Sequence, residues 1–330
     1  MNCIRFQVNK FSMAAIALTM LAVLIAAISA AAQTSTAPAV VHNTWTTGTP
    51  MPSPIAWSTA AVLKNQIYVV GGINSANETT ADVEIYNPAT DNWSTGVPLP
   101  SPIWGATSAV VKNVLYVFGG YGCGNVCGTA WAFNPKTKSW VSKAPMLTAQ
   151  GSARAVAYNN IVYVIGGNTS GEGRIATVES YDPANNTWTD EAPLLDGKSE
   201  LSVGLMGTTI VAADGYTGSG DTGDNEAYNI TTNSWSYLIS DPTPRNGSCT
   251  GVIGANLYVS DGNDDSNNAI TVNESFNLTK DKWRSLATMP ETVTDMSFAV
   301  YKGKLYCIGG GSYAIQFQGN VYDYVQIYQP

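Results

Sequence analysis

The amino-acid sequence predicts an all-β fold: a six-bladed β-propeller with four antiparallel strands per blade, closed by an N-terminal strand that completes the last blade. Three observations predict it. The apolar run IYVVGG at 67–72 returns as LYVFGG, IVYVIGG and LYCIGG, in a pattern that repeats every 47 or 48 residues. An aromatic–polar pair and a Trp follow at the same intervals. No amphipathic helical periodicity appears after residue 32.

Each repeat supplies four strands. Small and apolar residues such as STAAVL at 58–63 form the first strand, and a turn at Lys64–Asn65 leads to the strand that ends in glycine. A polar loop follows, then a third strand such as ADVEIY at 81–86, a turn, and a short strand that holds Trp93. Four-stranded units repeated six times are typical of a β-propeller.

The two ends of the chain predict how the ring closes. The last repeat ends at Pro330 without a Trp strand, whereas Trp45 lies 48 residues before Trp93. We therefore expect the strand around Trp45 to be the outer strand of blade six, which removes an exposed sheet edge. The expected organisation is a signal peptide at 1–32, a short linker at 33–42 and a propeller at 43–330.

The N-terminal segment has the pattern of a secretory signal peptide. Arg5 and Lys10 precede an apolar run and small residues, with cleavage expected near Ala32–Gln33. Because the run is long, an uncleaved membrane anchor is the alternative. Without this segment the chain holds 14 basic and 24 acidic residues, which argues against a nucleic-acid partner. We expect a secreted or periplasmic monomer with no membrane span after signal cleavage.

Of the five cysteines, Cys3 lies in the expected signal peptide, and the other four are considered as two pairs. Cys123 and Cys127 lie in the glycine-rich segment YGCGNVCG, for which we predict a disulfide in an oxidising compartment. The alternative is a metal-binding pair, although two further ligands are missing nearby. Cys249 and Cys307 lie in strand-like runs, and we expect two buried thiols there rather than a bridge.

The repeated motif also indicates a family. The run apolar–Tyr–Val–x–Gly–Gly, followed by pairs such as YNP and YDP and then Trp, resembles the kelch repeat over nearly all of residues 43–330. The resemblance implies that the second strand of each blade ends at the glycine pair, where a missing Cβ permits close approach and positive φ. Because Asp214 and Asp261 replace the first glycine in two repeats, we expect only the other glycine of each pair to be obligatory. We expect the repeated Tyr and Trp rings to pack between blades with their polar tips bonded.

Loops before the inner strands and loops after the glycines should share one face, which carries aromatic and charged residues among Asn, Ser and Gly. The candidate ligand-binding residues on this face are Trp57, Trp104, Tyr121, Arg154, Glu200, Tyr216, Arg245 and Tyr313. Aromatic rings beside short polar groups suit carbohydrate. Arginines and Lys198 could bind a carboxylate or phosphate. Alternatively, the tryptophans fill the mouth of the shaft and the charged residues are solvated loop tips.

Cofactor chemistry has little support in the sequence. Asp214, Asp221, Asp261 and Asp264, in the acidic loops of repeats four and five, form a weak candidate calcium site. The alternative is solvated loops in which two aspartates replace glycine. Kelch-type copper oxidases are similar in fold, but their sites need two histidines and this chain has only His42. We expect no copper and predict no other cofactor.

The expected role is a binding module for a glycan or an extracellular protein. A single histidine argues against a Ser–His–acid triad. The alternative is a sugar mutarotase or epimerase resembling the periplasmic kelch-type sialic acid mutarotase, in which Arg and Glu would assist ring opening. Glycoside hydrolysis by paired carboxylates also stays open. An enzyme should gather its charged residues in one pocket at the shaft mouth, whereas a binding module should spread aromatic residues over a shallower face.

Overall fold

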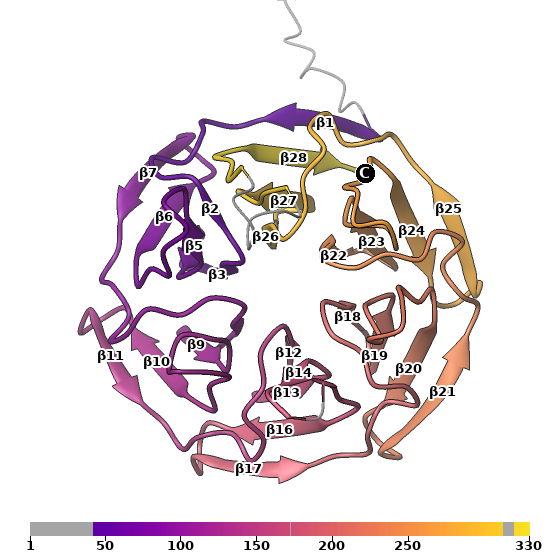
Figure 1. The fold of residues 1–330 in the computed structure, drawn as a ribbon, viewed down its shortest axis with the longest axis horizontal. Helices are drawn as coiled ribbons and strands as arrows, with labels where there is room; N and C mark the ends of the chain where they lie inside the picture. The colour runs from indigo at the N-terminus through magenta and orange to yellow at the C-terminus, as the bar shows by residue number, and fades with distance from the viewer. Residues whose placement is uncertain (1–41, 172, 313–319) are drawn as a thin grey trace, which may run out of the picture. The chain divides into compact units, whose positions relative to one another are not determined.

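The computed structural model describes residues 42–171, 173–312 and 320–330. These residues form six four-stranded antiparallel sheets arranged as blades around a central shaft (Figure 1). The predicted six-bladed propeller is therefore confirmed. The predicted signal peptide, residues 33–41 of the linker and Tyr313 lie outside the described residues. No helix in the described part of the chain is long and apolar enough to cross a bilayer.

Each blade runs from an inner strand at the shaft to an outer strand at the rim. The inner strands are β3 (Thr59–Leu63), β8 (Thr107–Val111), β12 (Arg154–Tyr158), β18 (Ser202–Met206), β22 (Cys249–Ile253) and β26 (Ser297–Tyr301). The second strands are β4 (Gln66–Val70), β9 (Val114–Phe118), β13 (Ile161–Ile165), β19 (Thr209–Ala213), β23 (Asn256–Ser260) and β27 (Lys304–Ile308). The third strands are β6 (Val83–Asn87), β10 (Ala130–Asn134), β16 (Val178–Asp182), β20 (Asn225–Asn229), β24 (Asn273–Asn277) and β28 (Val325–Gln329). The outer strands are β7 (Asn92–Thr95), β11 (Ser139–Ser142), β17 (Thr187–Asp190), β21 (Ser234–Leu238), β25 (Lys282–Ser285) and β1 (Thr44–Thr47).

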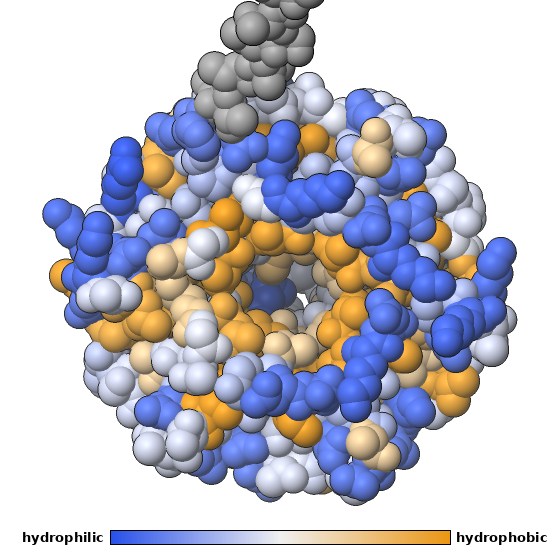
Figure 2. Space-filling view, turned by 180° about the vertical axis from the view of Figure 1, so that it is seen from behind, coloured by the Kyte–Doolittle hydropathy of each residue, from blue (hydrophilic) through white to orange (hydrophobic). Residues whose placement is uncertain are grey.

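The loops on one face carry short ladders of their own, which the sequence did not predict. In blade 1, β2 (Ile55–Ala56) pairs with β5 (Ile73–Asn74), and in blade 3, β14 (Asn168–Thr169) pairs with β15 (Gly173–Arg174). The β2–β5 pair joins the loop before an inner strand to the loop after a glycine pair, whereas β14 and β15 pair within one loop after a glycine pair. We call this side the loop-rich face. On the face opposite the view of Figure 1, apolar residues surround the shaft opening (Figure 2).

Blade 6 is closed by the N-terminal strand, as predicted. β1 pairs antiparallel with β28, and Trp45 lies opposite Tyr328 in the register. The two rings are 5.0 Å apart, and the indole Nε1 of Trp45 donates to Ala287 O of blade 5 at 2.8 Å. One short strand therefore completes the last sheet and binds the preceding blade.

The repeated aromatic residues pack between blades, also as predicted. The Tyr86 and Trp93 rings are 4.9 Å apart, and the indole nitrogen donates to Thr49 O in the segment that leads into the blade. The equivalent Trp188 donates to Ala144 O at 2.9 Å. Both indole N–H groups are bonded, so these partly buried rings pack without an unsatisfied donor.

The two glycines of a pair lie against different neighbours. A Cβ on Gly71 would lie 2.4 Å from Ile103 O of the next blade, whereas a Cβ on Gly72 would lie 2.6 Å from Ala56 O of its own blade. Asp214 and Asp261 keep the positive φ of the first glycine, at 58° and 59°. The first position therefore tolerates Asp, which adopts the left-handed conformation more readily than most residues.

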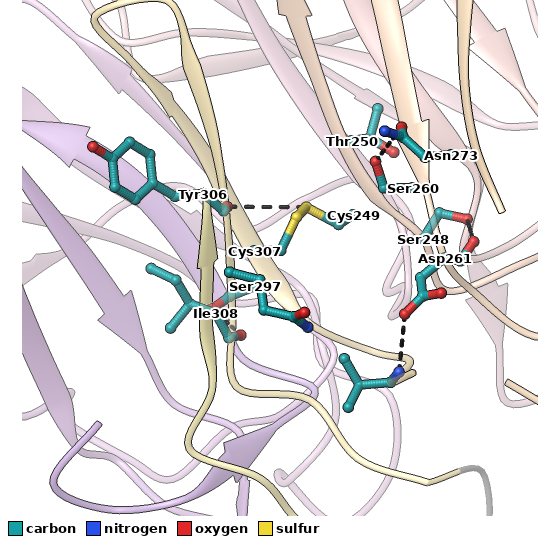
Figure 3. Close-up of a disulfide and its surroundings, with 12 residues drawn as sticks. Ser248, Cys249, Thr250, Ser260, Asp261, Asn273, Ser297, Tyr306, Cys307 and Ile308 are labelled. Carbon is teal, nitrogen blue, oxygen red and sulfur yellow. Dashed lines mark hydrogen bonds between the residues drawn. A yellow bond between two sulfur atoms is a disulfide. The ribbon is translucent and has the colours of Figure 1, made fainter. Parts of the chain in front are cut away.

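The structure contains two disulfides in its described part. Cys123 and Cys127 are joined with Cα atoms 5.8 Å apart, the pairing expected from the sequence. Cys249 and Cys307 are also joined, with Cα atoms 5.7 Å apart (Figure 3), so the expectation of two free buried thiols was wrong. Cys249 lies on β22 of blade 5 and Cys307 on β27 of blade 6. The propeller brings these strands to within disulfide distance, which the sequence spacing alone does not reveal.

Removing the closing strand should destabilise the whole propeller. Deletion of residues 40–48 takes away β1, the Trp45–Tyr328 contact and the bond to Ala287, and it exposes the edge of β28. We expect a loss of roughly 3–5 kcal/mol in the free energy of unfolding, comparable to removing one large buried aromatic residue. Thermal and urea unfolding of the deletion variant provide the measurement. An unchanged melting temperature would contradict the role of β1 in closure.

The two disulfides should differ in their contribution to stability. The Cys249–Cys307 bridge spans 58 residues and the Cys123–Cys127 bridge spans 4. Loop-closure entropy gives about 4 kcal/mol for the longer loop and about 2 kcal/mol for the shorter one. Urea unfolding of the Cys249→Ala/Cys307→Ala variant should therefore show the larger loss, with Cys123→Ala/Cys127→Ala as the matched control. Equal losses would show that loop length does not govern the effect.

Candidate functional site at the mouth of the shaft

Six residues, one from each blade, form a closed ring of backbone hydrogen bonds around the shaft. Each N–H donates to the carbonyl of the ring member in the preceding blade, with N···O distances from 2.8 to 3.1 Å. We call this the mouth ring; its members are Trp57, Gly105, Ser152, Glu200, Gly247 and Asp295. All six have positive φ, between 52° and 67°. For Trp57, Ser152, Glu200 and Asp295 this conformation is unfavourable by itself, so the ring bonds hold these side chains in place.

Three aromatic side chains lie on the side of blades 1 and 2. The rings of Trp57 and Trp104 meet edge to face at 5.4 Å, and Trp104 stacks on Tyr121 at 4.2 Å. The backbones of Trp104 and Tyr121 also pair, with N···O distances of 3.0 and 2.8 Å. Tyr121 covers Gly151, where a Cβ would lie 2.3 Å from its ring. All three rings are partly exposed. This aromatic cluster is therefore rigid and open to solvent.

Three charged side chains gather beside it in the shaft. Trp57, Arg154, Glu200 and Asp295 line the same hollow. The Arg154 guanidinium lies 5.3 Å from the Phe298 ring centre, on a strand of another blade. Burial raises the pKa of Glu200 to about 7, although Arg154 and Arg174 oppose the shift. Burial and the charge of Glu200 raise the pKa of Asp295 well above its usual range. The charged set (Arg154, Glu200, Asp295) can thus donate as well as accept hydrogen bonds near neutral pH.

A second polar group extends the site over blades 3 to 5. The Arg174 guanidinium lies 4.4 Å from the centre of the Tyr216 ring. Asn246 Nδ2 donates to Asp221 Oδ1 at 2.7 Å. Partial burial and the charges of Asp265 and Asp264 raise the pKa of Asp221 to about 6, although the hydrogen bond from Asn246 opposes the shift. The face therefore has an aromatic side over blades 1 and 2 and a polar side over blades 3 to 5.

The enclosed space at the mouth is small. The hollow lined by Trp57, Arg154, Glu200 and Asp295 has a volume of about 20 Å³. A second hollow, deeper in the shaft and also lined by Arg154, has a volume of about 50 Å³. A single water needs about 10–15 Å³ measured in this way, whereas ligand pockets measure about 300–1,000 Å³. A ligand would therefore lie across the mouth, with only a small group inserted.

Two predicted charged residues are absent from this face. Arg245 and Lys198 are fully buried. Arg245 forms ion pairs with Asp241 and Glu274, and Lys198 pairs with Glu226 at 3.1 Å. The assignment of Arg245 to the ligand-binding face was therefore wrong. The alternative, that the charged residues are solvated loop tips, was also wrong for Arg245 and Lys198. A buried cation is costly unless paired, and Glu226 on β20, Glu274 on β24 and Asp241 in a loop supply the partners.

The four aspartates proposed for calcium do not converge. Asp214 and Asp261 are fully buried, and Asp261 Oδ2 accepts from Val293 N at 2.9 Å. Burial raises the pKa of Asp261 to about 8. Asp264 instead accepts from Ser266 N and Asn268 N in its own exposed loop, while Asp221 is bonded to Asn246. In the described ranges no group of three His, Cys, Asp or Glu residues could hold a metal ion.

The site includes three residues that the sequence analysis did not select. Ser152 and Asp295 belong to the mouth ring, and Arg174 stacks on Tyr216. The repeat register could have found the first two, because Ser152 and Asp295 lie at the same 47- or 48-residue spacing as Trp57 and Glu200. No comparable signal marks Arg174, which lies in a loop of variable length. Trp57, Trp104, Tyr121, Arg154, Glu200 and Tyr216 are brought together on one face.

Comparison with known proteins identifies the repeats. Residues 36–199 match the model of the KLHDC2/KLHL20/DRC7 Kelch-repeats domain. Human Kelch-like protein 23 is 27% identical over 156 residues, which cover 46% of this chain and 26% of that protein. Chicken Kelch-like protein 15 is 33% identical over 85 residues, which cover 26% of this chain and 17% of that protein. The alignments thus span about a quarter or less of these relatives' length.

A solved structure agrees with the fold. The structure titled "Structure of YjhT" superposes with a TM-score of 0.71 at 19% identity, covering 84% of this chain and 96% of that chain. At this identity the likeness concerns the fold alone. Together with six repeats in register and six four-stranded blades, the match to the Kelch-repeats model and the similarity to Kelch-like proteins show that the chain belongs to the kelch-repeat β-propeller family.

Proposed function

We propose that this protein is an exported binding module that recognises a glycan across the mouth of its shaft. One observation carries the proposal: the aromatic cluster and the charged set adjoin each other on the mouth ring. Aromatic faces stack on the C–H faces of a sugar, and its hydroxyls need nearby donors and acceptors. Ser152, Arg154, Glu200 and Asp295 supply these groups, and the ring bonds fix three of the four backbones.

The size of the mouth favours binding over catalysis. A sugar ring does not fit into the hollow of about 20 Å³ that the described residues form at the mouth, so these residues do not enclose a sugar there. A shallow site with rigid aromatic residues is instead suited to recognition with little loss of side-chain entropy. Kelch repeats are interaction modules, and an extracellular protein is the alternative ligand for the same face.

One observation favours a second candidate, a sugar mutarotase or epimerase. The charged residues share one pocket, which is the arrangement expected of an enzyme, and the pKa of Glu200 is raised to about 7. A carboxyl group that titrates near neutrality can both donate and accept a proton during ring opening. Arg154 would hold the carboxylate of an acidic sugar beside it.

Glycan binding should depend on the aromatic cluster. A glycan array probed with residues 33–330 should show a defined ligand. The Trp57→Ala/Trp104→Ala variant should then bind at least about tenfold more weakly, as expected when central aromatic anchors are truncated. Arg154→Gln, which leaves the rings intact, should also weaken binding. Tyr237→Ala is the matched control, because this Tyr is 59% exposed on the outer strand of blade 4.

Equal weakening in the Tyr237 control would contradict a site at the mouth. If no glycan binds the wild-type chain, the glycan proposal is wrong and a protein ligand takes its place. For the second candidate, one-dimensional NMR of an acidic sugar reports anomer exchange directly. Acceleration by the wild type that disappears in Glu200→Gln would support the enzyme over the binding module.

A further inference from the structure

A larger hollow, lined by no residue of the mouth ring, lies between blades 5 and 6. Its volume is about 600 Å³, within the range of ligand pockets. β24 and β25 of blade 5, with the turn between them, form one wall. Tyr328, Asn43 and His42 of blade 6 and its closing segment form the other. We call it the basic hollow because of the charges described below.

The basic hollow exists because blade 6 differs from the other five. In those blades a hairpin turn joins the third strand to the outer strand. In blade 6, β28 and β1 come from distant parts of the chain, so no such turn connects them. His42 and Pro330 meet there through a contact between the His42 ring nitrogen and Pro330 O. The position of the hollow is therefore set by the closure of the propeller.

Three cations line the basic hollow. Lys280, Lys282 and Arg284 are exposed on β25 and the turn before it. No Asp or Glu side chain lines the hollow, and none of the three cations forms a salt bridge with another described residue. Asp281, which lies between the lysines, instead accepts from Ile239 N of blade 4 at 3.0 Å. In a chain with 24 acidic and 16 basic residues, this is a local excess of unpaired positive charge.

The remaining wall offers neutral hydrogen-bonding groups and aromatic carbon. Ser275 lies opposite Arg284 in the register, and Asn277 lies opposite Lys282. Asn277 Nδ2 donates to Asn256 Oδ1 at 2.8 Å, which fixes both amides at the edge of the hollow. Tyr258 adds an aromatic side chain at the wall. Amides, a hydroxyl and an aromatic edge beside cations match a sugar that carries an anionic group.

We propose that the basic hollow is a second binding site, specific for an anionic saccharide that bears sulfate or carboxylate groups. The cations would pair with the anionic groups, and the amides of Asn256 and Asn277 would bond the hydroxyls. A long polyanion or an anionic membrane is disfavoured, because the chain as a whole carries a formal net charge of −8 and offers only three cations at this site. This site is independent of the shaft mouth.

The test uses a heparin-derived tetrasaccharide as the anionic probe and maltotetraose as the neutral probe. Isothermal titration at low ionic strength should show binding of the sulfated probe alone. Lys282→Ala/Arg284→Ala should weaken it about a hundredfold, or roughly tenfold for each charged hydrogen-bond donor removed. Both side chains are exposed, so the variant should fold normally, as thermal unfolding can verify. Trp57→Ala/Trp104→Ala should bind the sulfated probe like the wild type.

The matched control is Lys136→Ala/Lys138→Ala, in the corresponding hairpin turn of blade 2, which does not line the hollow. This control should bind the tetrasaccharide like the wild type. Equal loss in the control would overturn the proposal, because it would indicate unspecific attraction. Absence of wild-type binding, or equal binding of maltotetraose, would also overturn it. Binding to phosphatidylserine vesicles in place of the tetrasaccharide would overturn the saccharide assignment.

Discussion

The mouth ring is the constraint on which the rest of the structure depends. Its six hydrogen bonds join every blade to its two neighbours, and each bond needs a residue with positive φ at the same place in the repeat. A ring of this kind exists only if all six blades are present and the last one is held in position. The closing strand β1 and the Cys249–Cys307 bridge both act on blade 6, where the chain provides no hairpin turn to the outer strand.

The same ring determines the chemistry of the candidate site. Because four ring members are not glycine, the bonds carry an indole, a hydroxyl and two carboxyl groups to the shaft opening. Close packing around the shaft removes water from these carboxyl groups. Burial accordingly raises the pKa of Glu200 to about 7 and the pKa of Asp295 well above its usual range. A strained but fixed backbone thus creates a preorganised surface with both aromatic and polar character.

Much of the fold could be predicted because the same pattern of strands, glycines and aromatic residues occurs six times in the sequence. The Trp spacing indicated the closing strand, and the glycine pairs marked the ends of the second strands. The register could also have led to Asp295, which occupies the same place as Glu200 in another blade. The sequence could not indicate which individual charged residues would be buried. Arg154 is the first residue of β12 and reaches the shaft, whereas Arg245 lies in the loop before β22 and is enclosed with Asp241 and Glu274. The burial of Arg245 depends on these two acidic partners, one of which lies on β24. The Cys249–Cys307 disulfide was also not predicted, because its two cysteines lie on neighbouring blades and only the folded propeller brings them together.

Native-state hydrogen exchange of the six ring amides tests the central role of the mouth ring most directly. Measured by NMR on the folded protein, the amides of Trp57, Gly105, Ser152, Glu200, Gly247 and Asp295 should exchange together and only through global unfolding. Their opening free energies should then equal the free energy of unfolding from urea titration. If any of these amides exchanges as fast as those of the exposed loops, the ring opens locally and does not hold the blades as one unit.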